Sequence, residues 1–250
     1  MSKQIIIHPK YSFLHSFIEH LPEVFLTEGE YIHDGRNKIK VFEINGLRIN
    51  VKRYRIPLLI NRFIYLYFRK TKAERAYEYA LILQNKGINT PSPIAYIIEK
   101  MNGLLGFSYF ISLQVNYSRR LYEFGTNPLT SENQKILHEL GNYTAQLHNQ
   151  KIFHQDYSPG NILFDIKNNK PEFCIVDINR MCFGPVSFKK GCANFARLWG
   201  TPEMFKIMAT AYAQNRGWDV EKVCQEVLKE RQRYWKKATR KRPAKFPLEF

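Results

Sequence analysis

Three polar residues of this sequence stand in contexts suited to chemistry: Asp156, Asn161 and Asp177. The first two belong to Phe153–Asp165, which has the form H-x-D-x-x-P-x-N and joins a helical pattern to a strand pattern. An aspartate on such a loop can accept the proton of an attacking hydroxyl, and an asparagine close behind it can hold a divalent cation between phosphates. Both could merely cap a turn. The full pattern favours a catalytic base at Asp156 and a metal ligand at Asn161.

Asp177 ends a short apolar run, Cys174–Val176. A buried strand that carries an acid to its own end is a rigid way to hold a magnesium ligand. Considered alone, a carboxylate in this position more often only solvates the end of a strand. Its place directly after the loop and a predicted hairpin favours magnesium ligation at Asp177.

Short strands with one main helix account for the chain up to about Gln114. The turn Asn45-Gly46 predicts that Ile39–Ile44 and Leu47–Tyr54 pair as antiparallel strands. Thr71–Lys86 carries apolar residues at helical spacing and stops at Gly87, a usual residue after a helix end. This part of the chain is therefore expected to form a small, strand-rich lobe.

Helices dominate the rest of the chain. Apolar residues three and four positions apart predict a helix over Ser131–Gln150, with Ser131 as its N-cap. Two strands, Asn161–Asp165 and Phe173–Val176, are expected around a polar turn, and helical patterns resume from about Asn194. The fold class predicted is α+β, with a larger helical lobe after the small one.

The composition is that of a globular protein of 250 residues, 44% of them hydrophobic. The longest apolar stretch, Ile56–Phe68, is interrupted by polar residues and is shorter than the roughly 18 to 20 residues that span a bilayer. Met1–Tyr11 lacks the apolar region and cleavage site of a secretory signal. The four cysteines form no C-x-x-C pair, which argues against a zinc site and for free thiols. These features predict a cytoplasmic protein.

The net charge of +16 indicates a polyanionic partner such as anionic lipid, a phosphorylated glycan or nucleic acid. No nucleic-acid motif accompanies the charge, so nucleic acid is not the expected partner. The segment Ile56–Lys70 suits a membrane interface, although a connector packed on the small lobe is the favoured interpretation. The cationic tail Lys229–Lys245 is either an anionic-surface contact or a solvated helix face with a loose end. The tail cations expected to contact lipid are Arg231, Arg233, Lys236 and Lys237.

Over roughly residues 30–200, in colinear order, the sequence resembles the lipopolysaccharide core kinases, the Kdo and heptose kinases of the protein-kinase-like superfamily. The resemblance implies a single bilobal kinase-like domain over 1–250. Its N-lobe, about 1–114, would hold a small antiparallel sheet with one main helix, and its C-lobe, about 115–250, would be larger and helical. ATP and Mg²⁺ are the cofactors that the resemblance implies.

In that family a strand lysine touches the nucleotide phosphates and pairs with a helix glutamate. Here Lys52, on the opposite side of its strand from Val51, takes the place of that lysine, with a solvated strand lysine as the alternative. Glu78 is chosen as its partner over Glu74 because of its position relative to Gly87. These assignments are what the resemblance implies.

The resemblance also gives two main-chain contacts to the nucleotide. Tyr31–Lys38 takes the place of the turn that covers the phosphates, but its single Gly35 is far from a G-x-G-x-x-G loop, and a plain charged turn is the alternative. Leu113 stands at the lobe connection, where its backbone would meet adenine. His154 is expected to pack and form hydrogen bonds rather than to catalyse.

Departures from the protein-kinase pattern concern regulation. Gln155 replaces the arginine that reads a phosphorylated activation loop, and no A-P-E motif follows Asp177. We therefore expect an ATP-dependent kinase whose acceptor is a sugar hydroxyl of a lipid-linked, lipopolysaccharide-type glycan, attached peripherally to the inner face of the cytoplasmic membrane. The alternatives are a small-molecule kinase of the aminoglycoside or choline type, a protein kinase, or a nucleotide-binding pseudokinase. Oligomeric state is left open.

Overall fold

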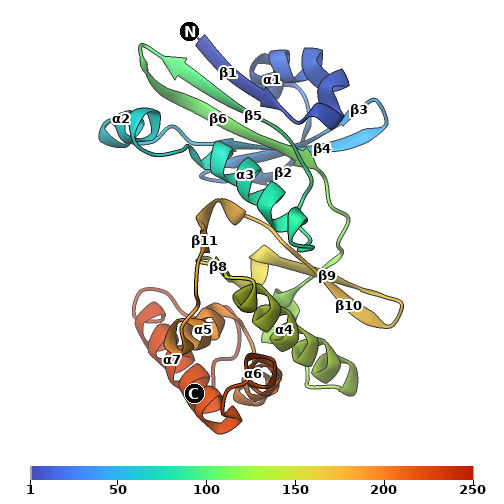
Figure 1. The fold of residues 1–250 in the computed structure, drawn as a ribbon, viewed down its shortest axis with the longest axis vertical. Coiled ribbons are helices and arrows are strands. Elements are labelled where there is room, and N and C mark those ends of the chain that lie inside the picture. Colours follow the sequence, from blue (N-terminus) through green and yellow to red (C-terminus); the bar gives the residue numbers. More distant parts are fainter. Residues whose placement is uncertain (1, 250) are drawn as a thin grey trace. The chain divides into compact units, whose positions relative to one another are not determined.

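The computed structural model of the chain describes residues 2–249, and the side chains of Leu66 and Tyr67 lie outside what it describes. The chain divides into two compact units, an N-terminal unit that ends at Asn116 and a C-terminal unit that begins at Tyr117 (Figure 1). Each unit has its own sheet and helices, and each is described here by itself.

An antiparallel sheet is the centre of the N-terminal unit. Within the described residues it has six strands in the order β1-β5-β6-β4-β3-β2. In that order the strands are β1 (Ser2–Ile7), β5 (Pro93–Met101), β6 (Leu104–Leu113), β4 (Leu47–Tyr54), β3 (Lys38–Ile44) and β2 (Glu30–Asp34). The predicted β3–β4 hairpin is confirmed, since Ile44 pairs with Leu47 across the turn. Asn45 and Gly46 both have positive φ, as the tight hairpin turn requires.

Helices cover both faces of this sheet (Figure 1). On one face α1 (His15–Thr27) places Leu21 and Phe25 in a core with Ile49 and Ile97 of the strands. On the other face α3 (Lys72–Asn85) packs on β5 and β6. Strand β5 is therefore buried on both sides, which is why residues 93–98 are apolar without alternation.

The predicted helix of this unit is confirmed, with α3 lying inside Thr71–Lys86. The Thr71 hydroxyl accepts a hydrogen bond of 3.2 Å from the backbone N–H of Glu74, which caps the start of the helix. Gly87, at φ 69°, allows the chain to leave it. The sequence did not predict α1 or α2 (Leu59–Tyr67), which connects β4 to α3 and packs on β6.

Helices make up most of the C-terminal unit, and short strands carry its loops. The helices are α4 (Ser131–Asn149), α5 (Phe188–Asn194), α6 (Pro202–Arg216) and α7 (Val220–Ala238). The strands are β7 (Arg119–Arg120), β8 (Ile152–His154), β9 (Ile162–Lys167), β10 (Lys170–Ile175) and β11 (Met181–Phe183). These strands form two small sheets. In one, β9 pairs with β10 and β7, and in the other, β8 pairs with β11.

Helix α4 confirms the predicted core helix but corrects its cap. Thr130, in extended conformation, accepts a hydrogen bond of 3.2 Å from the N–H of Asn133, so Thr130 and not Ser131 is the N-cap. Gly141 lies where α4 meets α6, because a Cβ added to it would come within 2.3 Å of the Met208 carbonyl oxygen. The missing side chain therefore permits the close approach of the two helices.

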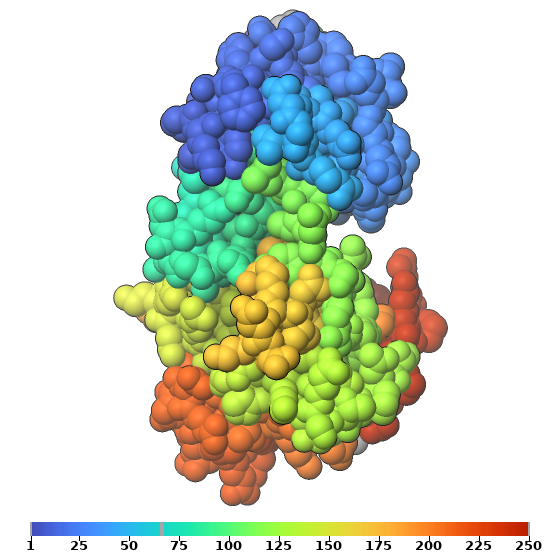
Figure 2. All heavy atoms as spheres, turned by 90° about the vertical axis from the view of Figure 1, so that its right-hand side faces the viewer, coloured from blue at the N-terminus to red at the C-terminus, as the bar shows by residue number. Residues whose placement is uncertain are grey.

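The β9–β10 hairpin lies at the surface of this unit (Figure 2, yellow to orange). Its turn residues Asn168 and Asn169 both have positive φ, a conformation that asparagine tolerates. The two predicted strands are confirmed, with ends that differ by up to three residues. The helical C-terminal unit and the sheet-based N-terminal unit together confirm the α+β class.

The segment after α7 is part of the packed structure. Phe246 is buried and stacks on Trp199 at a centroid distance of 5.0 Å. Arg231 of α7 is only 1% exposed and donates to the carbonyl oxygens of Gly200, at 2.8 Å, and Glu249. The expectation that Arg231 belongs to a lipid-facing cationic cluster is therefore wrong, because its charge is committed inside the protein.

Candidate functional site

The loop that carries Asp156 begins at a buried histidine. His154 ends β8, and its Nδ1 accepts a hydrogen bond of 3.0 Å from the backbone N–H of Asp156. Its Nε2 lies 3.1 Å from the Val176 carbonyl oxygen, so the two partners together fix a neutral ring with its proton on Nε2. Burial lowers the pKa of His154. The structure thus gives His154 the structural role expected from the sequence.

Two arginines face the carboxylate of Asp156. Arg197 forms an ion pair with Oδ1, and Nη1 of Arg180 lies 3.8 Å from Oδ2. In the described part of the chain, buried Oδ1 has no aligned hydrogen bond, so the contact with Arg197 is chiefly one of charge. Asp156 itself is 18% exposed at its side chain, which leaves it accessible to a small reactant.

Sequence reasoning missed Arg197 as a site residue. It belongs to the short turn Phe195–Arg197 that follows α5. Asn194, at the end of α5, donates a hydrogen bond of 3.0 Å from Nδ2 to the His154 carbonyl oxygen. The segment after α5 is thereby fixed to the loop, and one helical turn brings Arg197 to Asp156. Nothing in the spacing of Arg197 from the loop motif signalled this contact.

Asn161 is fixed at both its main chain and its side chain. Its Nδ2 donates a hydrogen bond of 2.8 Å to the Asp156 carbonyl oxygen, and its backbone oxygen accepts one of 3.0 Å from the N–H of Val176. The second bond places Asn161 directly beside the strand that leads to Asp177. The structure therefore brings together the predicted base and the two predicted metal ligands, all three in the C-terminal unit.

Asp177 sits in a left-handed backbone conformation, with φ 55° and ψ 44°. Its Oδ1 accepts a hydrogen bond of 2.6 Å from the side-chain amide of Asn179, which is itself buried. A non-glycine residue with positive φ is uncommon and often marks a functional position, although Asp tolerates it better than most.

The donor chemistry at Asn161 and Asp177 fits magnesium. Because Nδ2 of Asn161 is used as a donor, its Oδ1 is the atom that can ligate a cation. An amide oxygen and a carboxylate are hard ligands of the kind Mg²⁺ prefers, with the remaining positions taken by phosphate oxygens and water. Within residues 2–249, no cluster of three His, Cys, Asp or Glu side chains offers a competing metal site.

The other predicted nucleotide contacts lie in the N-terminal unit. On β4, Val51 is buried and Lys52 is half-buried on the opposite face, with Nζ 5.4 Å from the centre of the Tyr54 ring. Glu78 of α3 forms an ion pair with Lys70. Glu74, one turn earlier, stands in the first turn of the same helix. The pairing of Lys52 with either glutamate stays a prediction.

Gly35 and Leu113 both lie at the ends of strands. Gly35 directly follows β2, and Leu113 is the last residue of β6. Gly35 lies in the bend between β2 and β3, which is shorter than the turn expected over Tyr31–Lys38 because β2 continues to Asp34. Leu113 ends β6, and its N–H donates a hydrogen bond of 2.9 Å to the Ser92 carbonyl oxygen. This hydrogen bond occupies the Leu113 N–H, so a contact with adenine would have to use the Leu113 carbonyl oxygen or side chain.

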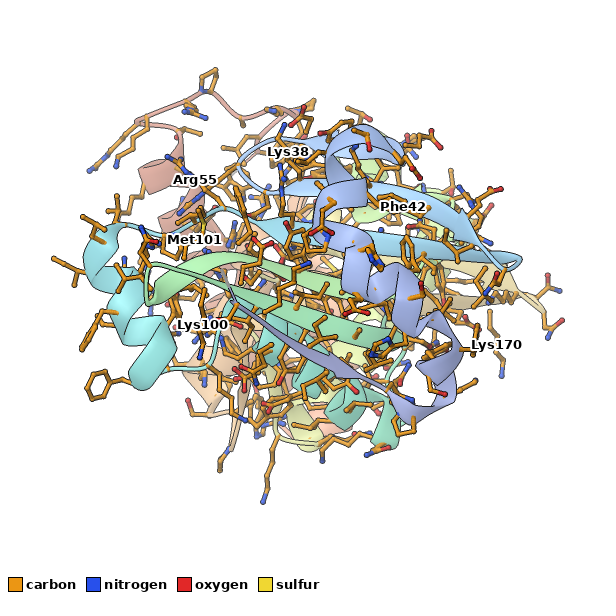
Figure 3. The ribbon with its side chains drawn as sticks, turned by 90° about the horizontal axis from the view of Figure 1, so that it is seen from above. Lys38, Phe42, Arg55, Lys100, Met101 and Lys170 are labelled. Atoms are coloured by element: carbon orange, nitrogen blue, oxygen red, sulfur yellow. The ribbon has the colours of Figure 1, made fainter. Side chains whose placement is uncertain are left out.

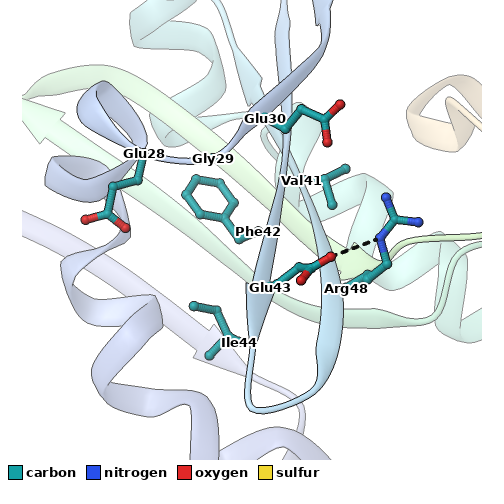
Figure 4. A pocket seen from close by; sticks show the side chains of 8 residues that line it. All are labelled: Glu28, Gly29, Glu30, Val41, Phe42, Glu43, Ile44 and Arg48. Atoms are coloured by element: carbon teal, nitrogen blue, oxygen red, sulfur yellow. Dashed lines mark ion pairs between the residues drawn. The ribbon is translucent and has the colours of Figure 1, made fainter.

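A hollow at the tip of the β3–β4 hairpin does not include these residues (Figure 4). Its lining carries three glutamates and one arginine, with Arg48 Nε 3.8 Å from Glu43. The residues are Glu28, Gly29, Glu30, Val41, Phe42, Glu43, Ile44 and Arg48. Carboxylates repel a polyphosphate. Its three glutamates therefore make this hollow poorly suited to a polyphosphate.

Solved structures with the same fold are kinases. One, described as WaaP in complex with acyl carrier protein, matches with a TM-score of 0.62 at 12% identity over 95% of this chain and 98% of that one. Another, the Rio2 kinase–ADP/Mg²⁺–phosphoaspartate complex from Chaetomium thermophilum, matches with a TM-score of 0.50 at 14% identity over 92% and 78%. Identities this low establish the fold alone, and they confirm the kinase-like fold predicted from the sequence.

The family is established by a match of the sequence to a family model. No individual curated protein matches the sequence. The model of the family described as "Lipopolysaccharide kinase (Kdo/WaaP) family" matches residues 27–198, and this match confirms the resemblance seen in the motifs. Because the match spans well over half of its length, the chain belongs to the lipopolysaccharide kinase (Kdo/WaaP) family.

Proposed function

We propose that this protein transfers the γ-phosphate of ATP to a hydroxyl of an anionic sugar in a lipopolysaccharide-type core. Membership of a kinase family supports phosphoryl transfer. The observation that carries the proposal is the single loop that holds Asp156, Asn161 and, through the Val176–Asn161 hydrogen bond, Asp177 in one group. Such a group supplies both a proton acceptor and a metal site.

In the proposed reaction, Asp156 takes the proton of the acceptor hydroxyl as the new oxygen–phosphorus bond forms and the bond to the ADP oxygen breaks. Asn161 and Asp177 would hold Mg²⁺, which supplies neutralisation of the phosphate charge when bound. The hydrogen bond from the Asn161 amide to the Asp156 main chain keeps the base and the metal ligand in a fixed relation. His154 orients the Asp156 backbone by accepting a hydrogen bond from its N–H.

Two arginines beside the base support an anionic acceptor. Arg180 is 56% exposed and Arg197 is 39% exposed at the side chain, so both can contact a substrate as well as Asp156. Guanidinium groups bind carboxylate and phosphate strongly. A negatively charged sugar would approach the base more readily here than a neutral alcohol. This favours a core sugar acid or phosphosugar over an aminoglycoside or choline.

Partner and location follow as further parts of the proposal. The solved WaaP structure contains acyl carrier protein, which makes that protein a candidate partner to test by co-purification. Among residues 2–249, no helix is long and apolar enough to cross a membrane. The net charge of +16 supports peripheral attachment to an anionic membrane surface, where a lipid-linked glycan would be found.

Phosphate transfer to candidate acceptors is the direct test. Purified protein, ATP and magnesium would be offered a lipid-linked core glycan, a soluble amino alcohol and a generic protein substrate, with products identified by mass spectrometry. We expect phosphorylation of the glycan, and deletion of the gene should leave the envelope glycan short of one phosphate. Efficient turnover of the soluble alcohol or protein with an unaltered glycan would defeat the proposal. Nucleotide binding without any transfer would indicate a pseudokinase.

A further inference from the structure

Helix α2 presents its apolar side chains to solvent. Leu58, just before the helix, and Ile60 within it are each 78% exposed, and Phe68, just after it, is 77% exposed. Leu59 is 68% and Phe63 49% exposed. The segment is the packed connector favoured from the sequence, since α2 joins β4 to α3 and packs on β6, but this packing leaves its large apolar residues exposed.

Three of the exposed apolar residues share one side of the helix. At 100° per residue, Leu59, Ile60 and Phe63 fall within an arc of about 100°, and Arg62 lies outside that arc. Arg62 donates a hydrogen bond of 2.6 Å from Nε to the Leu105 carbonyl oxygen of β6. A polar side chain thus attaches α2 to the sheet, and the apolar side points outward. Figure 3 shows α2 at the margin of the N-terminal unit, with the labelled Lys100 and Met101 of the β5–β6 turn near it.

The chain segment that contains α2 carries charges of one sign, although Lys70 pairs with Glu78 and Arg48 with Glu43. From Ile44 to Ala73 the sequence contains no Asp or Glu. The cations of that stretch are Arg48, Lys52, Arg53, Arg55, Arg62, Arg69, Lys70 and Lys72. Arg55 and Arg69, on either side of α2, are exposed. A cationic surround complements a surface of anionic headgroups.

We infer that α2 is a membrane-docking element, which lies in the interface of an anionic bilayer with Leu58, Ile60 and their neighbours among the acyl chains. The helix is far too short to span a bilayer, but a short helix with an apolar face and flanking cations is suited to lie in the interface. The protruding row of large side chains fits a deformable lipid surface. This inference assigns to one element the membrane attachment that the proposed function requires only in general terms.

The C-terminal tail is a weaker candidate for the same role. Arg231 is buried, and Arg233 forms an ion pair of 2.5 Å with Glu230. Two of the four tail cations expected to meet lipid are therefore already paired or enclosed. The tail also lacks a row of exposed large apolar residues among the described positions.

Vesicle binding without ATP tests the inference apart from any catalysis. The probes are vesicles of phosphatidylcholine with phosphatidylglycerol and vesicles of phosphatidylcholine alone. We expect binding that needs phosphatidylglycerol, fades as salt rises, and drops by about tenfold or more in Leu58→Gln/Ile60→Gln. The matched control is Phe13→Gln/Leu26→Gln, which removes two apolar residues that are 58% and 69% exposed elsewhere in the same unit. It should bind like the wild type.

Insertion is checked with a tryptophan at the helix. Ile60→Trp should be quenched by brominated lipid, whereas Leu26→Trp should not. Thermal stability of the α2 variant should match the wild type, since its changed side chains are exposed. The inference would be overturned if the α2 variant bound vesicles as the wild type does, or if the control variant lost as much binding. It would also be overturned if the α2 variant had a lowered Tm, or if the α2 face bound an acidic soluble protein but not vesicles. Turnover of a soluble acceptor by the α2 variant should be unchanged, so failure of docking and failure of the proposed kinase activity are distinguishable.

Discussion

The side-chain amide of Asn161 donates a hydrogen bond of 2.8 Å to the main-chain carbonyl oxygen of Asp156. This bond ties the predicted base to a predicted metal ligand within one turn of chain. In the proposed reaction, the same loop would therefore position both the acceptor hydroxyl and the phosphate charge. Such fixed relations are what phosphoryl transfer requires, because its catalysis consists largely of positioning and charge stabilisation.

Asp156→Asn should abolish phosphate transfer while ATP affinity stays within about twofold, because the carboxylate takes the proton of the acceptor and does not hold the nucleotide. Turnover and ATP binding by calorimetry are the two measurements. Asp165→Asn is the control, since the Asp165 carboxylate accepts hydrogen bonds from Ser118 in the same unit, away from the loop of Asp156. Wild-type turnover in Asp156→Asn would show that another group is the base.

Asp177→Asn should weaken magnesium-dependent ATP binding by about tenfold or more, because an anionic ligand becomes neutral. Asparagine tolerates the left-handed backbone found at this position, so the change removes charge without adding strain. Calorimetry with and without magnesium separates the metal-dependent part of the affinity. If that part were unchanged, Asp177 would be a structural partner of Asn179 and not a metal ligand.

Arg197→Gln should raise the KM for an anionic acceptor and lower kcat, together by about 10- to 100-fold in kcat/KM, because the guanidinium proposed to contact both the acceptor and Asp156 is lost. ATP affinity should not change. Arg180→Gln should have a smaller effect, since its guanidinium lies farther from the carboxylate, at 3.8 Å. Equal effects on charged and neutral acceptors would contradict a role for Arg197 in acceptor binding.

Stability should fall as pH is lowered from neutral, because His148 is buried as a neutral ring. Its Nδ1 and Nε2 contact Tyr212 at 2.8 Å and Asn194 at 3.0 Å, and burial lowers its pKa to about 4. The unfolded chain protonates this histidine below about pH 6.5, whereas the folded protein does not. The free energy of unfolding should therefore drop by roughly 2 kcal/mol between about pH 7.5 and pH 5 from this group.

Urea unfolding at the two pH values measures this effect. His148→Gln should flatten the pH dependence even if it lowers stability at neutral pH. His154, whose pKa is lowered in the same direction, should supply much of what remains. Identical slopes for His148→Gln and the wild type would show that His148 does not control acid stability.

The parts of the fold and site that are local in sequence could be predicted. Asn45-Gly46 has the dihedral preferences of one turn type, and Thr71 and Gly87 mark the ends of a helix by local hydrogen bonding and φ. The loop from His154 to Asn161 is likewise a continuous pattern. These features depend on neighbours along the chain, which the sequence displays directly.

Features that depend on tertiary contacts could not be predicted. Arg197 reaches Asp156 only because Asn194 fixes the preceding turn to His154, a contact between distant segments. The outward face of α2 has the same apolar period as a buried helix, so periodicity cannot tell which way it points. The sequence around Arg231 resembles that of an ordinary surface cation. Its burial depends on the carbonyl oxygens of Gly200 and Glu249, which come from distant segments.

The enclosure of Arg231 also constrains how the C-terminal unit is made. Gly200, one of the two carbonyl partners of Arg231, is synthesised before Arg231, but the other, Glu249, is synthesised after it. The Phe246 ring that stacks on Trp199 is also synthesised after Arg231. An arginine cannot be buried at low cost before its carbonyl partners are available. On the ribosome, the packing around α7 must therefore wait until residue 249 has emerged, so the C-terminal unit cannot complete its folding before the segment after α7 has been synthesised.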